Sequence, residues 1–306
     1  MSTPLAVREP QRTAATKDEA AQRTAPIKDE AARERAALRR RYLMCRPTHF
    51  TVAYRINPWM HPAEPTDTDL ALGQWQQLHD HYVELGHDIE LIDPLPGLPD
   101  MVYSANGGFT LDGVAYTAKF THPERQAEGP AYAEWFRQAG FRVHEAQEIN
   151  EGEGDLLLVG DAILAGTGFR TDVASHDEVR RVFDREVVTL RLVDPRFYHL
   201  DTAIAVLDPG GADANIAYLP GAFDDASRAE LQRRYPDAIE VGEADAQWLG
   251  LNSISDGEHV VIAARAAGFE QSLRERGYTP IGVDLSELLR GGGGVKCCTL
   301  ELRMQP

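Results

Sequence analysis

Residues 291–302 read GGGGVKCCTLEL, so four consecutive glycines precede two of the chain's three cysteines, Cys297 and Cys298. Glycine weakens a helix or strand interior, and four in a row mark a backbone that bends sharply or lies close to another group. Residues 295–302 are then expected to form a short strand. A thiol at the mouth of such a loop is well placed to act as a nucleophile, because the loop leaves room for a substrate. The alternative is an inert pair of small apolar residues buried in an edge strand.

Composition narrows the functions that the chain can have. It has 306 residues, 43% of them hydrophobic, and a formal net charge of −17. That charge disfavours nucleic acid and anionic membranes as partners and suits a small-molecule ligand. Three cysteines are too few for a disulfide framework and no secretory signal is visible, so we expect a cytoplasmic protein. Metal-binding motifs of the C-x-x-C or H-E-x-x-H type are missing, and we expect neither a metal nor another cofactor.

The N-terminal segment, residues 1–40, differs from the rest. Residues 12–22 (RTAATKDEAAQ) are echoed by residues 23–33 (RTAPIKDEAAR), with almost no large apolar side chain. Such a segment has little to bury. We expect residues 1–40 to be a disordered or loosely helical extension, with a partner-binding helix as the alternative. Residues 41–306 are expected to form one catalytic domain.

The body of the chain repeats a unit made of an opening loop, a β-hairpin, an amphipathic helix and a closing strand. The period, roughly 45–50 residues, is typical of repeated architectures. In one unit, Tyr132, Trp135, Phe136 and Ala139 form a single apolar face on the helix. The expected strands and hairpins are residues 42–52, 89–92, 101–111, 114–120, 141–144, 155–166, 187–192, 199–208, 215–220, 238–241, 251–264, 279–283 and 295–302.

Five such ββαβ units are present if the last one is split between the two ends of the body. Its first strand then comes from residues 295–302 and the remainder from residues 42–92. We therefore predict an α/β fold, a five-bladed α/β propeller of pseudo-symmetric ββαβ units closed by its terminal strands. A linear stack is the alternative, but it needs capping repeats that the sequence lacks.

The opening loops of the units would converge on the axis of such a ring. They supply amides, carboxylates, an imidazole and a thiol, from Asn106, Glu151, Asp155, His199, Asp201, Asn252 and Cys297. Cys297 would attack as a thiolate, and His199 would serve as general acid and then as general base. Glu151 or Asp155 would bind an imidazolium or a cationic group. Carboxylates around a thiol suit a planar cation with several N–H donors, because they accept guanidinium hydrogen bonds in pairs.

Residues 42–305 resemble the guanidino-group modifying enzymes, which include arginine deiminase, dimethylarginine dimethylaminohydrolase, amidinotransferases and arginine dihydrolases. The likeness lies in three motifs: GGGGVKCC, YHLDT at residues 198–202, and EGEGD at residues 151–155, which is close to that superfamily's EGGD. The resemblance implies the five-bladed propeller known as the pentein fold. It also implies a reaction without metal or cofactor, through a cysteine-bound S-alkylthiouronium intermediate.

The resemblance also implies roles for single residues. Cys297, not Cys298, would be the nucleophile, and His199 would be the acid and base. Glu151 would hold the guanidinium, and Asp201 would bind the same group. Arg170, in the stretch GFRTD, matches an arginine that binds the α-carboxylate of the substrate.

The sequence departs from the superfamily's pattern at two places. EGEGD is one residue longer than EGGD, so that Glu151 and Glu153 compete for one role. Asn106 stands where deiminases carry a guanidinium-binding aspartate, and an amide has no charge. Both departures weaken a plain arginine deiminase assignment.

The stretch that begins at Asn57, NPWM, resembles the opening of arginine dihydrolases. In those enzymes an asparagine there helps to direct arginine to ornithine instead of citrulline. The alternative is a turn packed by Trp59.

Three functions are therefore compared. The leading one is hydrolysis of arginine or a methylated arginine. The others are transfer of the amidino group to an acceptor amine and a non-catalytic binding module. The identity of the substrate, the number of nitrogens released and a homo-oligomeric state stay open at this point.

Overall fold

The computed structural model describes residue 1 and residues 35–208, 210 and 214–304. The chain divides into two compact units, Met1–Arg33 and Glu34–Pro306, and the second carries all the elements below. Most of the predicted extension at residues 1–40 lies outside the described residues and stays a prediction.

The end of that predicted segment, residues 35–40, contacts the body. Arg35 Nη1 lies 2.7 Å from Asp208 Oδ1, and its guanidinium lies over the ring of Tyr278. The backbone N–H of Leu38 donates to the carbonyl of Asp256 at 2.9 Å. Residues 35–40 therefore pack with the body.

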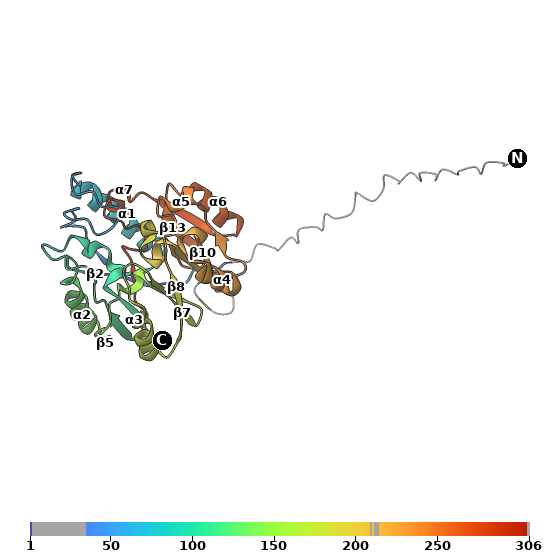
Figure 1. Ribbon diagram of the computed structural model, residues 1–306. Helices are drawn as coiled ribbons and strands as arrows, with labels where there is room; N and C mark the ends of the chain where they lie inside the picture. Colours follow the sequence, from blue (N-terminus) through green and yellow to red (C-terminus); the bar gives the residue numbers. More distant parts are fainter. Residues whose placement is uncertain (2–34, 209, 211–213, 305–306) are drawn as a thin grey trace. The chain divides into compact units, whose positions relative to one another are not determined.

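The described residues form five three-stranded sheets of one design (Figure 1). In each sheet the middle strand pairs antiparallel with the strand that opens the unit and parallel with the strand that closes it. In the order opening, middle and closing strand, the sheets are β15 (Leu300–Glu301), β1 (Arg41–Cys45) and β2 (Asp88–Ile92); β3 (Gly108–Leu111), β4 (Val114–Thr117) and β5 (Arg142–His144); β6 (Leu156–Val159), β7 (Ala162–Thr167) and β8 (Glu186–Arg191); β9 (Ile204–Asp208), β10 (Asn215–Tyr218) and β11 (Ile239–Glu240); and β12 (Ile254–Ser255), β13 (His259–Ala263) and β14 (Thr279–Val283).

A helix connects the middle strand to the closing strand of every sheet, because two parallel strands need a long crossover. These helices are α1 (Thr68–Glu84), α2 (Glu128–Gln138), α3 (Val173–Phe183), α4 (Asp225–Arg234) and α6 (Ala267–Glu275). Two short helices that the sequence did not predict, α5 (Glu243–Ala246) and α7 (Ser286–Leu289), follow closing strands. The repeated ββαβ order predicted from the sequence is thus confirmed in all five units, including the unit split between residues 41–92 and 300–301.

Two predicted strands are partly wrong. Residues 99–107 form two 3₁₀ turns, η1 (Pro99–Val102) and η2 (Ser104–Gly107), and the strand predicted at 101–111 begins only at Gly108. Residues 295–298 form a helical turn, in which the N–H of Cys298 donates to the carbonyl of Gly294 at 3.2 Å. Both segments are buried on all sides, so their sequences lack the alternation that separates a strand from a turn.

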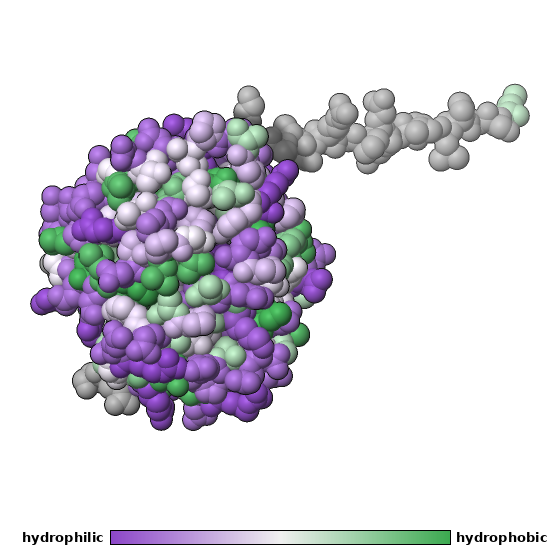
Figure 2. All heavy atoms as spheres, turned by 90° about the vertical axis from the view of Figure 1, so that its left-hand side faces the viewer, coloured by the Kyte–Doolittle hydropathy of each residue, from purple (hydrophilic) through white to green (hydrophobic). Residues whose placement is uncertain are grey.

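Large apolar side chains from the crossover helices fill the space beneath the sheets. Trp75 of α1, Tyr132 of α2 and Phe269 of α6 are almost completely buried. Figure 2 shows one face of the molecule, where apolar side chains are interspersed among hydrophilic ones, as is normal for a protein surface. Within the described part of the chain, no helix is both long and apolar enough to span a membrane.

The opening segments of successive units lie against one another. The strand β15 contacts β3, and β9 contacts both β6 and β12. The 3₁₀ turns η2, η3 (Gly152–Gly154) and η5 (Leu200–Thr202), which precede β3, β6 and β9, also touch each other. Residues from distant parts of the sequence therefore meet at the openings of the units.

Candidate active site

The thiol of Cys297 lies between two side chains from other units. Asn252 Nδ2 donates to Cys297 Sγ at 3.1 Å, and Asn252 Oδ1 accepts the Cys297 backbone N–H at 3.0 Å. Cys297 Sγ lies 3.4 Å from Asp201 Oδ2. Three of the predicted site residues are thus in direct contact, and Cys297 is buried with 2% of its surface exposed.

The glycine loop leaves room for these contacts. A Cβ on Gly293 would lie 2.4 Å from the ring of Tyr103 and 3.1 Å from Cys297 Cβ, so the backbone approaches both groups closely. Gly292 has φ +90°, a conformation that L-residues rarely adopt. The run of glycines is therefore required by close packing at Cys297.

Burial controls the protonation of this pair. It raises the pKa of Cys297 well above the usual value of a thiol, and the nearby Asp201 carboxylate raises it further. Burial also raises the pKa of Asp201 to about 7, although the charge of Lys296 opposes that rise. Without a cation beside them, both groups favour their neutral forms.

The imidazole of His199 is held by Glu151. His199 Nε2 lies 2.8 Å from Glu151 Oε2, and both side chains are buried. Arg170 Nη1 lies 3.0 Å from the same carboxylate oxygen. Burial alone would raise the pKa of Glu151, but Arg170 and His199 together lower it well below its usual range. Glu151 is therefore an anion beside the imidazole ring.

Arg170 is occupied by groups of the protein itself. Its Nη2 donates to the carbonyl of Ile56 at 2.8 Å, and its guanidinium lies over the ring of Tyr198 at 4.6 Å. It also lines the cavity beside Cys297. Its expected contact with a substrate α-carboxylate stays a prediction.

Glu153 has different partners from Glu151. It lies 2.7 Å from Lys296 Nζ, accepts the backbone N–H of Glu301 at 3.0 Å, and pairs with Arg303. The extra residue of EGEGD thus separates two carboxylates, one on His199 and one on the C-terminal segment.

Asp155 faces the backbone of the histidine loop. Its Oδ1 accepts the N–H of Leu200 at 3.0 Å, and its Oδ2 accepts the hydroxyl of Thr171 at 2.6 Å. Burial raises the pKa of Asp155 to about 6. Both oxygens are used to position the loop that carries His199, and Asp155 does not line the cavity beside Cys297.

Asn57 ties its own turn to the glycine loop. Its Oδ1 accepts the N–H of Trp59 at 2.9 Å, and its Nδ2 donates to the carbonyl of Gly291 at 3.0 Å and to Tyr198 Oη at 3.2 Å. Tyr198 Oη in turn donates to the carbonyl of Gly292 at 2.8 Å. The turn at Asn57 therefore closes over the cavity that Cys297 lines.

Asn106 faces two groups at the edge of this cavity. Its Oδ1 accepts from Arg125 Nη1 at 2.8 Å, and its Nδ2 lies 3.4 Å from the carbonyl of Glu151. The cavity is small, about 10 Å³, which is room for about one water molecule. A substrate the size of an amino acid needs the surrounding loops to move.

The sequence analysis missed two residues that line this cavity, Asp100 and Arg125. Asp100 Oδ1 is buried and has no hydrogen-bond partner among the described residues, and burial raises the pKa of its carboxyl. Arg125 pairs with Glu128 at 2.7 Å. The position of Asp100 at the start of a unit was the available signal, but it fell beside a stretch predicted as a strand.

No group of three or more His, Cys, Asp or Glu side chains in the described part of the chain is arranged to hold a metal ion. The polar groups that converge near Cys297 are instead a thiol, an imidazole, amides and several carboxylates. Such a set can carry out nucleophilic and acid–base chemistry on a cationic ligand.

Comparisons with known proteins agree with this arrangement. A family model described as N,N-dimethylarginine dimethylhydrolase, eukaryotic, matches residues 47–304. The chain is 54% identical over 263 residues to the N(G),N(G)-dimethylarginine dimethylaminohydrolase of Mycobacterium tuberculosis, and the match covers 86% of each chain. It is 39% identical over 272 residues to the bifunctional arginine dihydrolase/ornithine cyclodeaminase AgrE of Nostoc sp., covering 86% of this chain but 38% of that longer protein.

Solved structures give the same result. The N-terminal domain of ArgZ, an arginine dihydrolase from cyanobacteria, has been solved as a cysteine-to-serine mutant bound to substrate and, in another mutant, covalently bound to a reaction intermediate. The two structures match with TM-scores of 0.82 and 0.81 at 35% identity, covering 87% of this chain and 100% and 99% of theirs.

Proposed function

The chain belongs to the N,N-dimethylarginine dimethylhydrolase family, and from this membership we propose that it hydrolyses the guanidino group of arginine or a methylated arginine through a covalent bond to Cys297. Relatives that act on dimethylarginine and on arginine support a hydrolase of guanidino substrates.

One observation carries the proposal furthest. Asp201 Oδ1 is buried and has no hydrogen-bond partner among the described residues, while its Oδ2 touches the sulfur of Cys297. Buried carboxylate oxygens normally have partners. A guanidinium placed here would satisfy Asp201 and would present its central carbon to the thiol. Asp100 Oδ1, also without a partner, offers a second anion to a cationic group of the same substrate.

The substrate's own charge supplies what Cys297 lacks. Its thiol has a raised pKa in the absence of a cation. A bound guanidinium lowers that pKa by Coulomb attraction, so that the thiolate forms when the substrate is present. The arrangement protects the nucleophile when no substrate is bound.

The reaction then has two covalent stages. Cys297 Sγ bonds to the guanidinium carbon, and the bond from that carbon to the departing amine breaks as His199 gives that amine a proton. His199 next takes a proton from a water molecule, whose oxygen attacks the carbon of the S-alkylthiouronium. The carbon–sulfur bond breaks and Cys297 is regenerated. Glu151 holds the imidazole throughout, through its bond to Nε2.

The test is turnover by Cys297→Ser, with Cys298→Ala as the matched control. Cys298 is buried beside Cys297 but has no contact with Asp201 or Asn252 among the described residues. We expect Cys297→Ser to lose all measurable turnover and Cys298→Ala to retain it. Mass spectrometry of the quenched wild-type reaction should show a covalent adduct on the peptide that contains Cys297. Turnover by the serine variant rejects the proposal.

A second candidate is complete removal of both terminal nitrogens from arginine, which gives ornithine. Asn106 favours it, because its uncharged amide replaces the aspartate of deiminases, and dihydrolase relatives are among the matches. Screening arginine, monomethylarginine, dimethylarginine and agmatine for ornithine against citrulline separates the two products. Adding glycine or ornithine as acceptor amines tests amidino transfer, which would appear as a new guanidino compound.

The closed ring belongs to the same proposal. The opening strands of successive sheets contact one another, and β15 pairs with β1 from the other end of the body. We take the five sheets to be the blades of a five-bladed α/β propeller, whose axis carries the groups around Cys297.

A further inference from the structure

A second cavity, of about 190 Å³, lies on the other side of the glycine loop. Its walls are mostly apolar and include Leu249, Leu285, Leu289 and Val295. It is larger than an engineered apolar cavity of about 150 Å³ that binds benzene. The cavity therefore has room for a small aromatic or branched aliphatic body.

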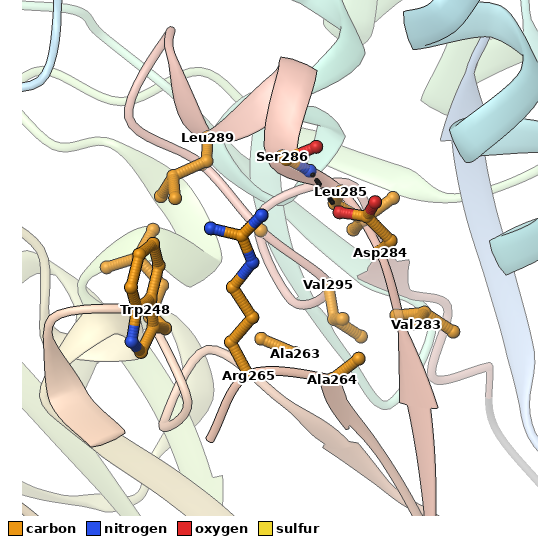
Figure 3. A pocket seen from close by; sticks show the side chains of 13 residues that line it. Trp248, Ala263, Ala264, Arg265, Val283, Asp284, Leu285, Ser286, Leu289 and Val295 are labelled. Atoms are coloured by element: carbon orange, nitrogen blue, oxygen red, sulfur yellow. Dashed lines mark hydrogen bonds between the residues drawn. The ribbon is translucent and has the colours of Figure 1, made fainter. Parts of the chain in front are cut away.

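One cation faces this apolar space. Figure 3 shows Arg265 extending into the cavity between Trp248 and Leu289 on one side and Leu285 and Asp284 on the other. Its guanidinium stacks over the ring of Trp248 at 4.7 Å, and within the described residues no ion pair joins it to a carboxylate. Asp284 is occupied, because its Oδ1 accepts the N–H of Ser286 at 2.9 Å. Arg265 is free to bind an anion.

Two loops connect this cavity to Cys297. Gly293 lines both the second cavity and the one beside Cys297. Leu249, which also lines the second cavity, has φ +53°, a strained conformation for a branched side chain. Three residues further along the chain, Asn252 holds the thiol of Cys297. A ligand in the second cavity would thus contact both segments that position the nucleophile.

We propose that this second cavity binds a small carboxylate with an apolar body, its carboxylate on Arg265, and that the bound ligand inhibits the reaction at Cys297. The inhibition rests on the proposed function, whereas the binding does not. The cavity beside Cys297 is too small for an amino acid, so the glycine loop must move to admit one. A ligand that binds only while Gly293–Val295 keeps its present position stabilises the closed state and weakens substrate binding.

Phenylacetate is the probe, with the neutral phenylacetamide as its matched control. We expect phenylacetate to raise the Tm of the wild-type protein saturably, and to raise the KM for the guanidino substrate while kcat stays unchanged. Phenylacetamide should do neither. Arg265→Gln should keep basal kinetics and bind phenylacetate at least about tenfold more weakly, because a charge-assisted hydrogen bond is lost.

Two further variants make the test specific to the cavity. Leu289→Trp fills the space and should abolish the Tm shift, whereas Arg137→Gln, an exposed arginine on α2, should leave it intact. A Tm shift that survives in Arg265→Gln and Leu289→Trp, or no shift with wild type, overturns the proposed site. A shift without any change in KM overturns the coupling alone. Because the Tm measurement needs no turnover, failure of the proposed function would be recognised separately.

Discussion

Glu151 and Glu153 stand two residues apart and are held by different parts of the molecule. Glu151 contacts His199 and Arg170, whereas Glu153 contacts Lys296 and Arg303. The sequence shows two acids in one turn and cannot tell them apart, since their partners lie far along the chain. The spatial contacts assign the first to the imidazole and the second to the C-terminal segment.

The exchange of each acid for glutamine should separate these tasks. We expect Glu151→Gln to lower kcat on the order of 100-fold, because the imidazole loses the anion that holds it. We also expect the pH profile of kcat to change. Glu153→Gln should lower the stability by about 3 kcal/mol, because it leaves buried cations without their anion. Its kcat per folded molecule should stay near that of wild type. Equal losses of kcat in both variants would contradict the assignment.

Asp201 predicts a pH dependence of stability. Burial raises its pKa from 3.8 to about 7 in the folded protein. Between these values the folded state keeps a proton that the unfolded state has lost, so this carboxyl makes folding less favourable as the pH rises through that window. Asp201→Asn removes the effect. We expect the variant to be more stable than wild type by up to about 4 kcal/mol near pH 8, with the difference vanishing near pH 4.

Urea unfolding at both pH values measures this difference, and Asp172→Asn, an exposed aspartate, is the control. The same Asp201→Asn variant should lose turnover, because the guanidinium loses its anion. A stability difference that does not change with pH would show that Asp201 is ionised in the folded protein.

Residue types were predictable from the sequence to a useful degree. Cys297, His199 and Glu151 could be chosen because a thiol, an imidazole and an acid open three units of one repeat. Asp100 and Arg125 could not, since a buried aspartate without a partner is recognised only from its surroundings. Their charges come from the turn before a strand and the loop before a helix, where polar residues are ordinary.

At the scale of elements, the crossover helices and paired strands followed their sequence patterns closely. The apolar face predicted from Tyr132 to Ala139 lies on α2, and the strand predicted at residues 279–283 is β14. The exceptions are the segments around residues 99–107 and 295–298. There the backbone is buried on every side and turns to bring polar groups together, so periodicity carries no information about it.

The glycine loop offers a prediction at this scale. In Gly292→Ala the new methyl group would lie 2.7 Å from both Asn57 Nδ2 and Tyr198 Oη, at a backbone φ of +90°. We expect a loss of about 1–3 kcal/mol in unfolding free energy and a large drop in kcat/KM. Gly73 in α1 is the matched control, because nothing lies within 4 Å of its added carbon. Gly73→Ala should gain about 0.5–1 kcal/mol and leave kcat/KM unchanged. Equal behaviour of the two variants would show that the loop tolerates side chains.

At the scale of the whole molecule, the five-unit repeat was visible because each unit carries the same order of hairpin, helix and strand. The pairing of β15 with β1 was predicted from the same repeat, since a unit lacking its first strand needs one from the other end of the body. Contacts between units were not visible. They depend on single polar side chains that reach from one sheet to another.

Arg303 is such a side chain and gives the last prediction. It pairs with Glu153 of the third sheet's opening turn, donates to the carbonyl of Thr110 in β3 at 3.2 Å, and lies 2.8 Å from Glu301 in β15. If the C-terminal strand locks the units together, Arg303→Met should lower the unfolding free energy by about 3 kcal/mol. Combined with Glu153→Gln, it should lose less than the sum of the single losses, with a coupling of about 1–3 kcal/mol. Arg137→Met, on the exposed face of α2, should change little. Strictly additive losses in urea unfolding would mean that Arg303 and Glu153 stabilise the molecule independently, and that this ion pair does not join the C-terminal strand to its neighbours.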